Sequence, residues 1–217
     1  MTLSSLRRRR YGARVPFNHN AHYHPLLLRL VPPGARRALD VGCGLGGFAR
    51  KLAAKGLDVD AIDQAAEVLE PARALGSPGP GTITYHRADV TAHPLPPRHY
   101  DIITCIASLH HLPFDTVTTL RDALAPHGVL AVLGLAKPST PRDWAIWLGS
   151  LPFNHVAKAV VSVAERLNGG ADPLPEAPVR DEGMSLNQIR REAARLLPGS
   201  RIRVLPFWRY LLVYRRV

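Results

Sequence analysis

Short apolar segments alternate with helical segments between residues 37 and 135, and this alternation limits the fold more than any other feature of the sequence. Each apolar run has the length of a buried strand. The predicted strands are Ala38–Val41, Leu57–Ile62, Thr82–His86, Tyr100–Ile106 and Gly128–Leu135, and the predicted helices are Phe48–Lys55, Gln64–Leu75 and Thr116–Leu124. Strands joined through single helices make right-handed crossovers and run parallel. The pattern therefore predicts an α/β domain built on a parallel sheet.

The two ends of the chain add helices and a strand pair to this sheet. A short helix is predicted around His22–Val31, after a loose arm at the amino end. Near the carboxyl end, Ser185 can cap a helix, with Gln188 as its capping-box partner. Two apolar runs follow, Arg201–Pro206 and Arg209–Val217. They are too close for a helical crossover, so we expect them to pair antiparallel.

Composition and charge narrow the class of protein. The chain has 217 residues, which suits one domain, and a net charge of +11. Only four of its 28 basic residues are lysine, a bias expected of a GC-rich coding sequence, so a solvated basic surface is favoured over a nucleic-acid partner. No apolar run approaches the ~18 residues of a membrane span, and no signal peptide follows Arg7–Arg10. Two separate cysteines, Cys43 and Cys105, suit a cytoplasmic protein.

A glycine-rich loop, Asp40 to Gly47, lies between the first predicted strand and the first core helix. Glycines there let the backbone turn tightly and let a ligand approach the N–H groups of a helix N-terminus. Gly42, Gly44 and Gly47 also match the dinucleotide pattern G-x-G-x-x-G. A turn without a ligand, a dinucleotide site and a site for another nucleoside all remain open on this loop alone.

Three carboxylates help to separate these alternatives. Asp40 ends the first strand, where it would repel a pyrophosphate but would attract a positively charged ligand. Asp63 ends the second strand and can accept hydrogen bonds from both ribose hydroxyls. Asp89 follows the third strand, where it can accept from an adenine amino group while Val90 packs on the ring, although a simple turn residue is the alternative. The set favours a cationic adenosine derivative.

Several segments resemble the motifs of the class I S-adenosylmethionine-dependent methyltransferases. Leu39 to Gly46 is similar to their motif I, and Tyr100–Ile103 followed by Ser108–Leu112 is similar to their fourth-strand motif. Leu124 to Leu130 resembles the fifth-strand motif, with His127 in place of the first of two glycines. The closing strand pair, which includes Trp208, resembles the family's seventh strand inserted beside a sixth.

The resemblance implies a Rossmann-like, doubly wound α/β fold with seven strands in the order 3-2-1-4-5-7-6. Strand 7 would be antiparallel and helices would cover both faces. One methyltransferase domain would span residues 1–217: an N-terminal arm and cap helix (1–35), a cofactor-binding core (36–135), a substrate-side insert (136–184), and the last helix with the antiparallel pair (185–217).

The resemblance also implies S-adenosylmethionine as cofactor and S-adenosylhomocysteine as product. The ligand would lie at the switch point between strands 1 and 4. The glycines would line its methionine portion, and the backbone after the fourth strand would close the pocket. The residues predicted to bind the cofactor are Asp40, Gly42, Gly44, Gly46, Asp63, Gln64, Asp89, Val90, Ile106, Ala107 and Tyr23.

Histidines supply the candidate catalytic groups. His110 and His111 follow the fourth strand on the side where the methyl group should lie, so one of them is a candidate general base. Orienting a loop or contacting the cofactor is the alternative role. A second histidine-rich patch includes Tyr23 and His24, and it is interpreted as a helix over the site or as a plain packed helix. A metal site is disfavoured because no acidic or cysteine partner lies at ligand spacing.

The expected reaction is methyl transfer to a small-molecule acceptor, with oxygen preferred to carbon or nitrogen, in quinone-type or natural-product metabolism. Trp144, Trp147, Leu151 and Phe153 in the insert would line an acceptor pocket or form the insert's own core, and weak contact with a membrane surface is a further alternative. The competing functions are an RNA or protein methyltransferase, an NAD(P)-dependent oxidoreductase and a non-catalytic S-adenosylmethionine-binding protein. The sequence does not indicate an oligomeric state.

Overall fold

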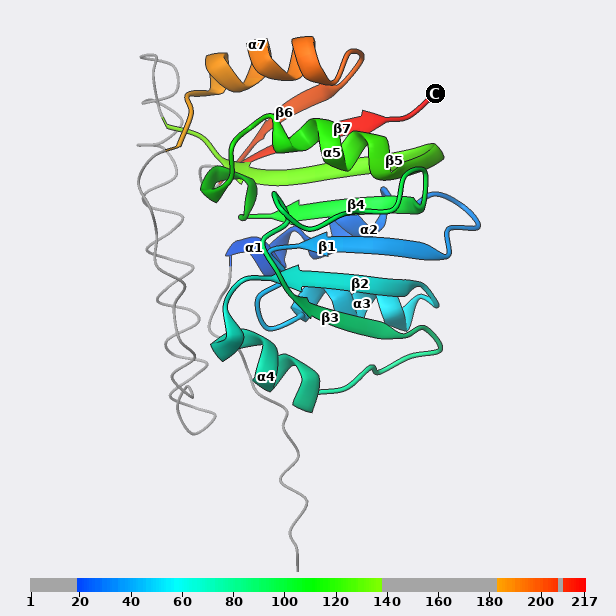
Figure 1. Ribbon diagram of the computed structural model, residues 1–217. Helices are drawn as coiled ribbons and strands as arrows, with labels where there is room; N and C mark the ends of the chain where they lie inside the picture. The colour runs from blue at the N-terminus through cyan, green and yellow to red at the C-terminus, as the bar shows by residue number, and fades with distance from the viewer. Residues whose placement is uncertain (1–18, 138–182, 207–208) are drawn as a thin grey trace, which may run out of the picture.

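The computed structural model describes residues 19–137, 183–206 and 209–217. Within them lies a seven-stranded sheet of order β3-β2-β1-β4-β5-β7-β6 (Figure 1). Strands β1 to β5 pair in parallel, whereas β7 is antiparallel to both β5 and β6. The strands are β1 (Arg37–Val41), β2 (Asp58–Asp63), β3 (Ile83–Arg87), β4 (Tyr100–Ile106), β5 (Leu124–Leu135), β6 (Arg201–Leu205) and β7 (Arg209–Arg215). The expected strand order and the antiparallel seventh strand are confirmed.

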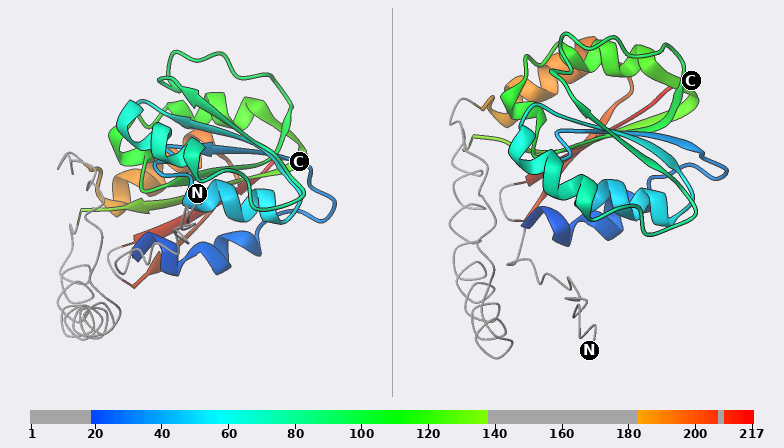
Figure 2. Two further views of the ribbon diagram at one scale, coloured as in Figure 1. Left: turned by 90° about the horizontal axis from the view of Figure 1, so that it is seen from below. Right: turned by 60° about the horizontal axis from the view of Figure 1, so that its bottom comes forward.

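Helices cover both faces of this sheet, which divides the apolar interior into two clusters. The helices are α1 (His19–His22), α2 (His24–Leu28), α3 (Gly47–Ala54), α4 (Ala66–Ala74), α5 (Thr116–Ala123) and α7 (Leu186–Leu196), with a short 3-10 helix, η1 (Leu109–His111). Side chains of α5 and α7 pack in one cluster, and those of α2 and α3 pack in the other. Figure 2 shows these pairs of helices on opposite sides of the sheet.

The predicted element boundaries are correct to within a few residues, with two exceptions. The short helix predicted around His22–Val31 is present as α2 but spans only His24–Leu28, and a separate turn of helix, α1, ends at His22 before it. Pro25 lies in the first turn of α2 and has no N–H to donate to a preceding turn, which explains the break. Strand β5 begins at Leu124 rather than Gly128.

His127 lies in this early part of β5, where it replaces a glycine of the family pattern. Its φ is 63°, in the left-handed region that glycine adopts without a steric cost and other residues rarely adopt. His127 therefore replaces glycine at a position whose backbone conformation has a steric cost for any residue with a side chain. The arm before His19, the aromatic residues of the insert and Trp208 lie outside the described residues.

Two arginine side chains, those of Arg216 and Arg121, bind the carbonyl groups at the carboxyl ends of helices α5 and α7. Nη1 of Arg216 donates to the carbonyl oxygens of Arg121, Asp122 and Leu124 at 2.9–3.0 Å, at the carboxyl end of α5. Nη1 of Arg121 in turn donates to the carbonyl oxygen of Leu196, at the end of α7, over 2.9 Å. These bonds satisfy carbonyls that a helix cannot pair internally, and a cation there also suits the helix dipole.

We expect Arg216→Ala to lower the free energy of unfolding by about 1–2 kcal/mol, because three carbonyl groups lose a charged donor. Urea unfolding followed by circular dichroism measures this change. Arg215→Ala is the matched control, since Arg215 is exposed and adjacent, and it should change stability by less than about 0.5 kcal/mol. Equal effects of the two substitutions would show that the bonds of Arg216 do not stabilise the fold.

Candidate functional site

The carboxyl ends of the parallel strands meet at one edge of the sheet, and backbone hydrogen bonds tie their loops together. The N–H groups of Gly42 and Cys43 both donate to the carbonyl oxygen of Ile62, over 2.8 and 3.1 Å. The hydroxyl of Ser108 donates to the carbonyl oxygen of Val41 over 2.6 Å. The loops after β1, β2 and β4 therefore form one connected structure at the point where the strand order reverses, which is where open α/β sheets bind ligands.

The glycine loop requires glycine at its first position for two reasons. Gly42 has a φ of 68°, and a Cβ atom there would overlap the Cβ of Ser108. Gly46 also has a positive φ, 69°, and it precedes α3 as an N-cap without a side-chain hydrogen bond. Gly46 therefore cannot cap α3 with a side chain, and the backbone N–H of Ala49 in the first turn is bonded by the carboxylate of Asp40 instead.

Asp40 is a buried carboxylate behind this loop. Its side chain is 2% exposed, and its Oδ1 accepts a hydrogen bond from the Thr104 hydroxyl over 2.7 Å. The pKa of Asp40 is raised to about 6: burial is the largest cause, the bonds from Thr104 and from the backbone of Ala49 partly offset it, and the charge of Asp63 adds to the rise. A carboxylate in this environment gains most from a cation, so the site fits a positively charged ligand better than a pyrophosphate.

Asp63 holds the glycine loop in place. Its Oδ2 accepts from the N–H of Gly44 over 2.8 Å, and its Oδ1 accepts from the N–H of Ala65 over 3.0 Å. Each carboxylate oxygen has a second lone pair, so these bonds leave acceptor capacity for ribose hydroxyls. The contact of Asp63 with ribose stays a prediction. In the structure, Asp63 also has the role of holding the glycine loop through its bonds to Gly44 and Ala65.

Asp89 and its neighbours lie beside the end of β3. Oδ1 of Asp89 accepts from both the N–H and the hydroxyl of Thr91, over 2.9 and 2.7 Å, as in an Asx turn. These bonds, with a weaker contribution from Gln64, lower the pKa of Asp89 below its ordinary value. Val90 is 3% exposed and belongs to the core cluster. The turn described as the alternative for Asp89 is therefore present, and a contact with adenine stays a prediction.

The segment after β4 brings the candidate catalytic groups to the same edge. Ala107 has a φ of 53° and donates its N–H to the carbonyl oxygen of Leu133 over 2.7 Å, while Ile106 is half-buried. The rings of His110 and His111 lie in contact with their centres 3.9 Å apart and their planes tilted by 45°, and His111 is exposed. The Nδ1 atom of His110 is buried and has no hydrogen-bond partner among the described residues.

The charge state of His110 follows from its surroundings. Burial, together with the smaller effect of the positive charges of His111 and Arg209, lowers the pKa of His110 to about 4. The imidazole is therefore neutral at physiological pH. A neutral imidazole with a free buried nitrogen can accept a proton from a ligand hydroxyl, which is the chemistry of a general base.

Tyr23 is placed differently from the cofactor contact predicted for it. Its hydroxyl donates to the carbonyl oxygen of Pro206 over 2.7 Å, and its ring is 5% exposed. Asn20 lies nearby and accepts from Nε of Arg209 over 3.1 Å. These contacts dock the N-terminal helices on the start of β7. The Tyr23 ring packs in the same apolar cluster as α3, which fits the plain packed helix given as the alternative, and a contact between Tyr23 and the cofactor stays a prediction.

Sequence reasoning missed Thr104, Ser108 and Arg209. Thr104 interrupts the apolar run of β4, and its register opposite Asp40 on β1 explains why a hydroxyl lies there. A single polar residue inside an apolar strand was the available signal. No local signal points to Arg209, which reaches this edge only because β7 returns antiparallel beside β5. Among the described residues, no group of three potential metal ligands is present.

Comparison with known proteins gives consistent results. A family model described as a methyltransferase domain matches residues 38–128. An uncharacterized methyltransferase of Mycobacterium tuberculosis is 34% identical over 205 residues, which cover 92% of this chain and 97% of that protein. A ubiquinone biosynthesis O-methyltransferase of Vibrio cholerae is 39% identical, but over only 88 residues, which are 40% of this chain and 36% of that enzyme.

Solved structures show the same fold at lower identity. A putative S-adenosylmethionine-dependent methyltransferase from Listeria monocytogenes has a TM-score of 0.61 and 15% identity, with 91% of this chain and 99% of that chain covered. Magnesium protoporphyrin IX methyltransferase from Synechocystis, with bound S-adenosylmethionine, has a TM-score of 0.58 and 16% identity, covering 92% and 80%. None of the described helices is both long and apolar enough to cross a membrane.

Proposed function

This chain belongs to the class I S-adenosylmethionine-dependent methyltransferases, and on that premise we propose that it methylates a small molecule, with an oxygen atom as the preferred acceptor. The observation that carries the proposal is the neutral, half-buried His110, whose Nδ1 atom has no partner among the described residues. The hydroxyl of an acceptor molecule would donate a hydrogen bond to this Nδ1 atom. The partial likeness to the Vibrio enzyme named as an O-methyltransferase supports the same choice of atom.

The donor would lie along the edge built from β1, β2 and β4. When bound, S-adenosylmethionine supplies a methyl group on a positively charged sulfur. Asp40 would stabilise the positive charge, and Gly42, Gly44 and Gly46 would admit the methionine portion to the loop. Asp63 would accept from the ribose, with Gln64, Asp89 and Val90 around the adenine. The backbone of Ile106 and Ala107 would close the pocket beside His110.

In the proposed reaction, the bond between sulfur and the methyl carbon breaks as the bond between that carbon and the acceptor oxygen forms. The acceptor's proton passes to Nδ1 of His110 and, after the product leaves, to solvent, so the products are a methyl ether and S-adenosylhomocysteine. The chain's contribution is to align the acceptor about 3–3.5 Å from the methyl carbon and to exclude water. A cytoplasmic location, predicted from the sequence, stays a prediction.

A screen with methyl-labelled donor tests the acceptor class. We expect label to enter phenols or quinols, and we expect the transfer to be insensitive to added salt. Total RNA and denatured protein serve as competing acceptors in the same assay. Transfer to RNA alone, with strong inhibition by salt, would replace the proposal with an RNA methyltransferase. Donor binding without transfer to any acceptor would favour a non-catalytic role.

We expect His110→Gln to lower kcat by about 10²–10⁴-fold without changing the dissociation constant of the donor. His111→Gln is the matched control, and because His111 is exposed its effect should be much smaller. A base acts in its neutral form, so with His110 at a pKa of about 4, kcat at saturating donor should stay level from pH 8 to pH 5 and fall only near pH 4. Loss of donor affinity in His110→Gln would contradict its role as a base.

A further inference from the structure

The two sides of the candidate site differ in charge. The donor side, at the ends of β1, β2 and β3, contains the carboxylates of Asp40, Asp63 and Asp89, and also the cations Arg50 and Arg87. The acceptor side is made of the ends of β4, β5 and β6, the start of β7 and the start of α7, which a bridge joins to the end of β5. Its described segments contain no Asp or Glu over residues 106–114, 134–137, 183–188, 205–206 and 209–210. Within these segments, positive charge occurs without a carboxylate.

Arg209 places a positive charge beside the candidate base. It begins β7 and pairs in register with Leu135 at the end of β5, next to β4, which leads to His110. Burial and then the charges of His111 and Arg209 lower the pKa of His110, so both cations lie close enough to act on its ring. Asp115, the first acidic residue after His111, is exposed at the start of α5 and is not among the charges that act on His110. The described surroundings of the base are therefore positively charged.

The guanidinium of Arg209 is half-buried and is held against the N-terminal helices. Its Nε donates to Oδ1 of Asn20 over 3.1 Å, and burial lowers the pKa of Arg209, which Tyr23 partly offsets. A guanidinium has five N–H donors in a planar fork, and it gains most from an anion when it is partly removed from water. Lys137, exposed just after β5, adds a second cation on the same side. Both charge and geometry therefore favour an anionic group beside the base.

We propose that the acceptor is a phenol that carries a carboxylate, and that Arg209 binds this carboxylate while the phenolic hydroxyl faces His110. The inference rests on the proposed function and adds the class of its substrate. The carboxylate would orient the ring and so align the hydroxyl with the methyl carbon. One half-buried guanidinium balances a single negative charge, which suits a carboxylate better than a doubly charged phosphate monoester. A cationic acceptor, such as an amine, would be repelled by Arg209 and Lys137.

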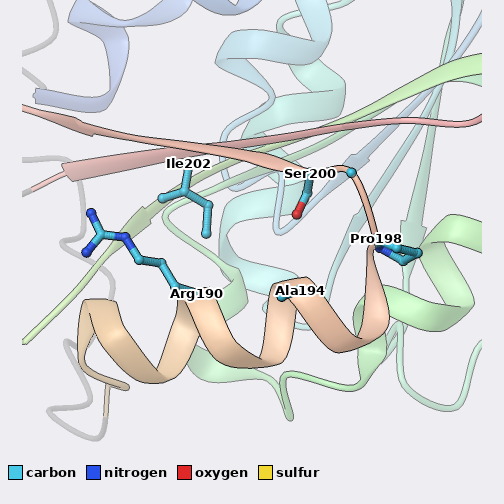
Figure 3. A pocket seen from close by; sticks show the side chains of 6 residues that line it. Arg190, Ala194, Pro198, Ser200 and Ile202 are labelled. Carbon is cyan, nitrogen blue, oxygen red and sulfur yellow. The ribbon is translucent and has the colours of Figure 1, made fainter.

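Arg190 is an arginine of equal charge that lies away from the candidate site. It is exposed on α7, at a hollow of about 350 Å³ between α7 and β6, where Figure 3 shows Ser200 and Ile202 on the strand side. This hollow lies at the start of β6, whereas the acceptor side lies at the other end of that strand, where Leu205 pairs with Arg209. Arg190 therefore provides a matched control for the charge of Arg209.

Binding of matched acceptor pairs tests the proposal without enzymatic turnover. The probes are hydroxybenzoates and hydroxycinnamates, each compared with its primary amide, which has a similar shape but no charge. Calorimetry with the protein saturated with S-adenosylhomocysteine measures their dissociation constants. We expect the carboxylate that binds best to bind at least about tenfold more tightly than its amide, because only the carboxylate pairs with the guanidinium. Equal affinities, tighter binding of the amides, or no binding of any carboxylate would overturn the proposal.

Four variants locate the carboxylate. Arg209→Gln should weaken carboxylate binding by about tenfold or more and leave amide binding unchanged, whereas Arg209→Lys, which keeps the charge without the fork, should retain part of the preference. Arg190→Gln removes an equal charge outside the site and should retain all of it. Asn20→Ala removes a bond to the N-terminal helices but keeps the guanidinium, so the preference should persist. Thermal unfolding verifies that each variant is folded.

The outcomes separate this inference from the proposed function. Equal weakening in Arg190→Gln and Arg209→Gln would mean that the acceptor responds only to net charge, and equal loss in Asn20→Ala would mean that Arg209 acts only by docking the helices; either result overturns the inference. Methyl transfer to neutral phenols alone would overturn it too, but would keep the proposed function. Carboxylate binding that depends on Arg209, without transfer of label to any acceptor, would support the anion site and contradict the proposed function.

Discussion

We expect Asp40→Asn to lose donor binding while making the protein more stable at neutral pH. The pKa of Asp40 is raised from 3.8 to about 6 by burial, so the fold disfavours its ionised form. Below about pH 4 the carboxyl is protonated in both folded and unfolded states, and it contributes nothing. The penalty grows as pH rises from 4 to 6 and is constant above, at about 3 kcal/mol. Asparagine removes this penalty.

Urea unfolding from pH 4 to pH 8, without donor, measures the stability change. The variant should gain about 1–3 kcal/mol over the wild type at pH 8 and almost nothing at pH 4. Asp58→Asn is the control with the opposite sign, because bonds from Thr82 lower the pKa of that exposed carboxyl and asparagine weakens them. A variant at position 40 that is less stable at pH 8 would contradict the argument.

Calorimetry with S-adenosylmethionine measures the expected loss of donor binding in Asp40→Asn. Asp40→Asn should weaken donor binding by about 10–100-fold, the effect of a lost charge-assisted contact in a buried site. In the wild type, affinity should rise with pH up to about 6, because the carboxyl must lose its proton to meet a cation. Unchanged affinity in the variant would remove Asp40 from the site and would reopen the choice between a cationic nucleoside and a dinucleotide.

The second large effect is expected from Gly42→Ala. An alanine there would adopt a φ of 68° and its Cβ would overlap that of Ser108, whose hydroxyl is bonded to the carbonyl oxygen of Val41. The backbone after β1 or the loop after β4 must therefore move. We expect the free energy of unfolding to fall by about 3 kcal/mol and donor binding to be lost, because the displaced loops form the site.

The variant Gly44→Ala serves to separate the cost of the left-handed backbone conformation from the cost of atomic overlap. Gly44 has a φ of 52°, but a Cβ atom there would meet nothing within 4 Å. Only the cost of the left-handed conformation remains, about 1–2 kcal/mol. Urea unfolding of both variants measures the difference. A similar loss in the two would mean that the contact between Gly42 and Ser108 does not limit the residue at position 42.

The sequence predicted the elements of this fold because their signals are local. Strands β1, β4 and β5 are apolar runs, β2 alternates polar and apolar residues, and Ser185 with Gln188 forms the expected capping box at the start of α7. The strand order came from the resemblance to a family, since the local pattern fixes only a parallel sheet with a closing antiparallel pair. The candidate site was predicted in part: the glycine loop and the acidic residues that end β1 and β2 lie together at the expected edge.

The remaining features of the site depend on residues far apart in the chain. Thr104 meets Asp40 from 64 positions away, and the hydroxyl of Tyr23 is donated to Pro206 from 183 positions away. The sequence therefore shows which carboxylates and histidines are available. Their burial, and with it the raised pKa of Asp40 and the lowered pKa of His110, exists only after the strands pair and exclude water. The sequence by itself determined the elements and the candidate groups, and the tertiary structure decided their partners and charge states, because register and desolvation are properties of packed strands.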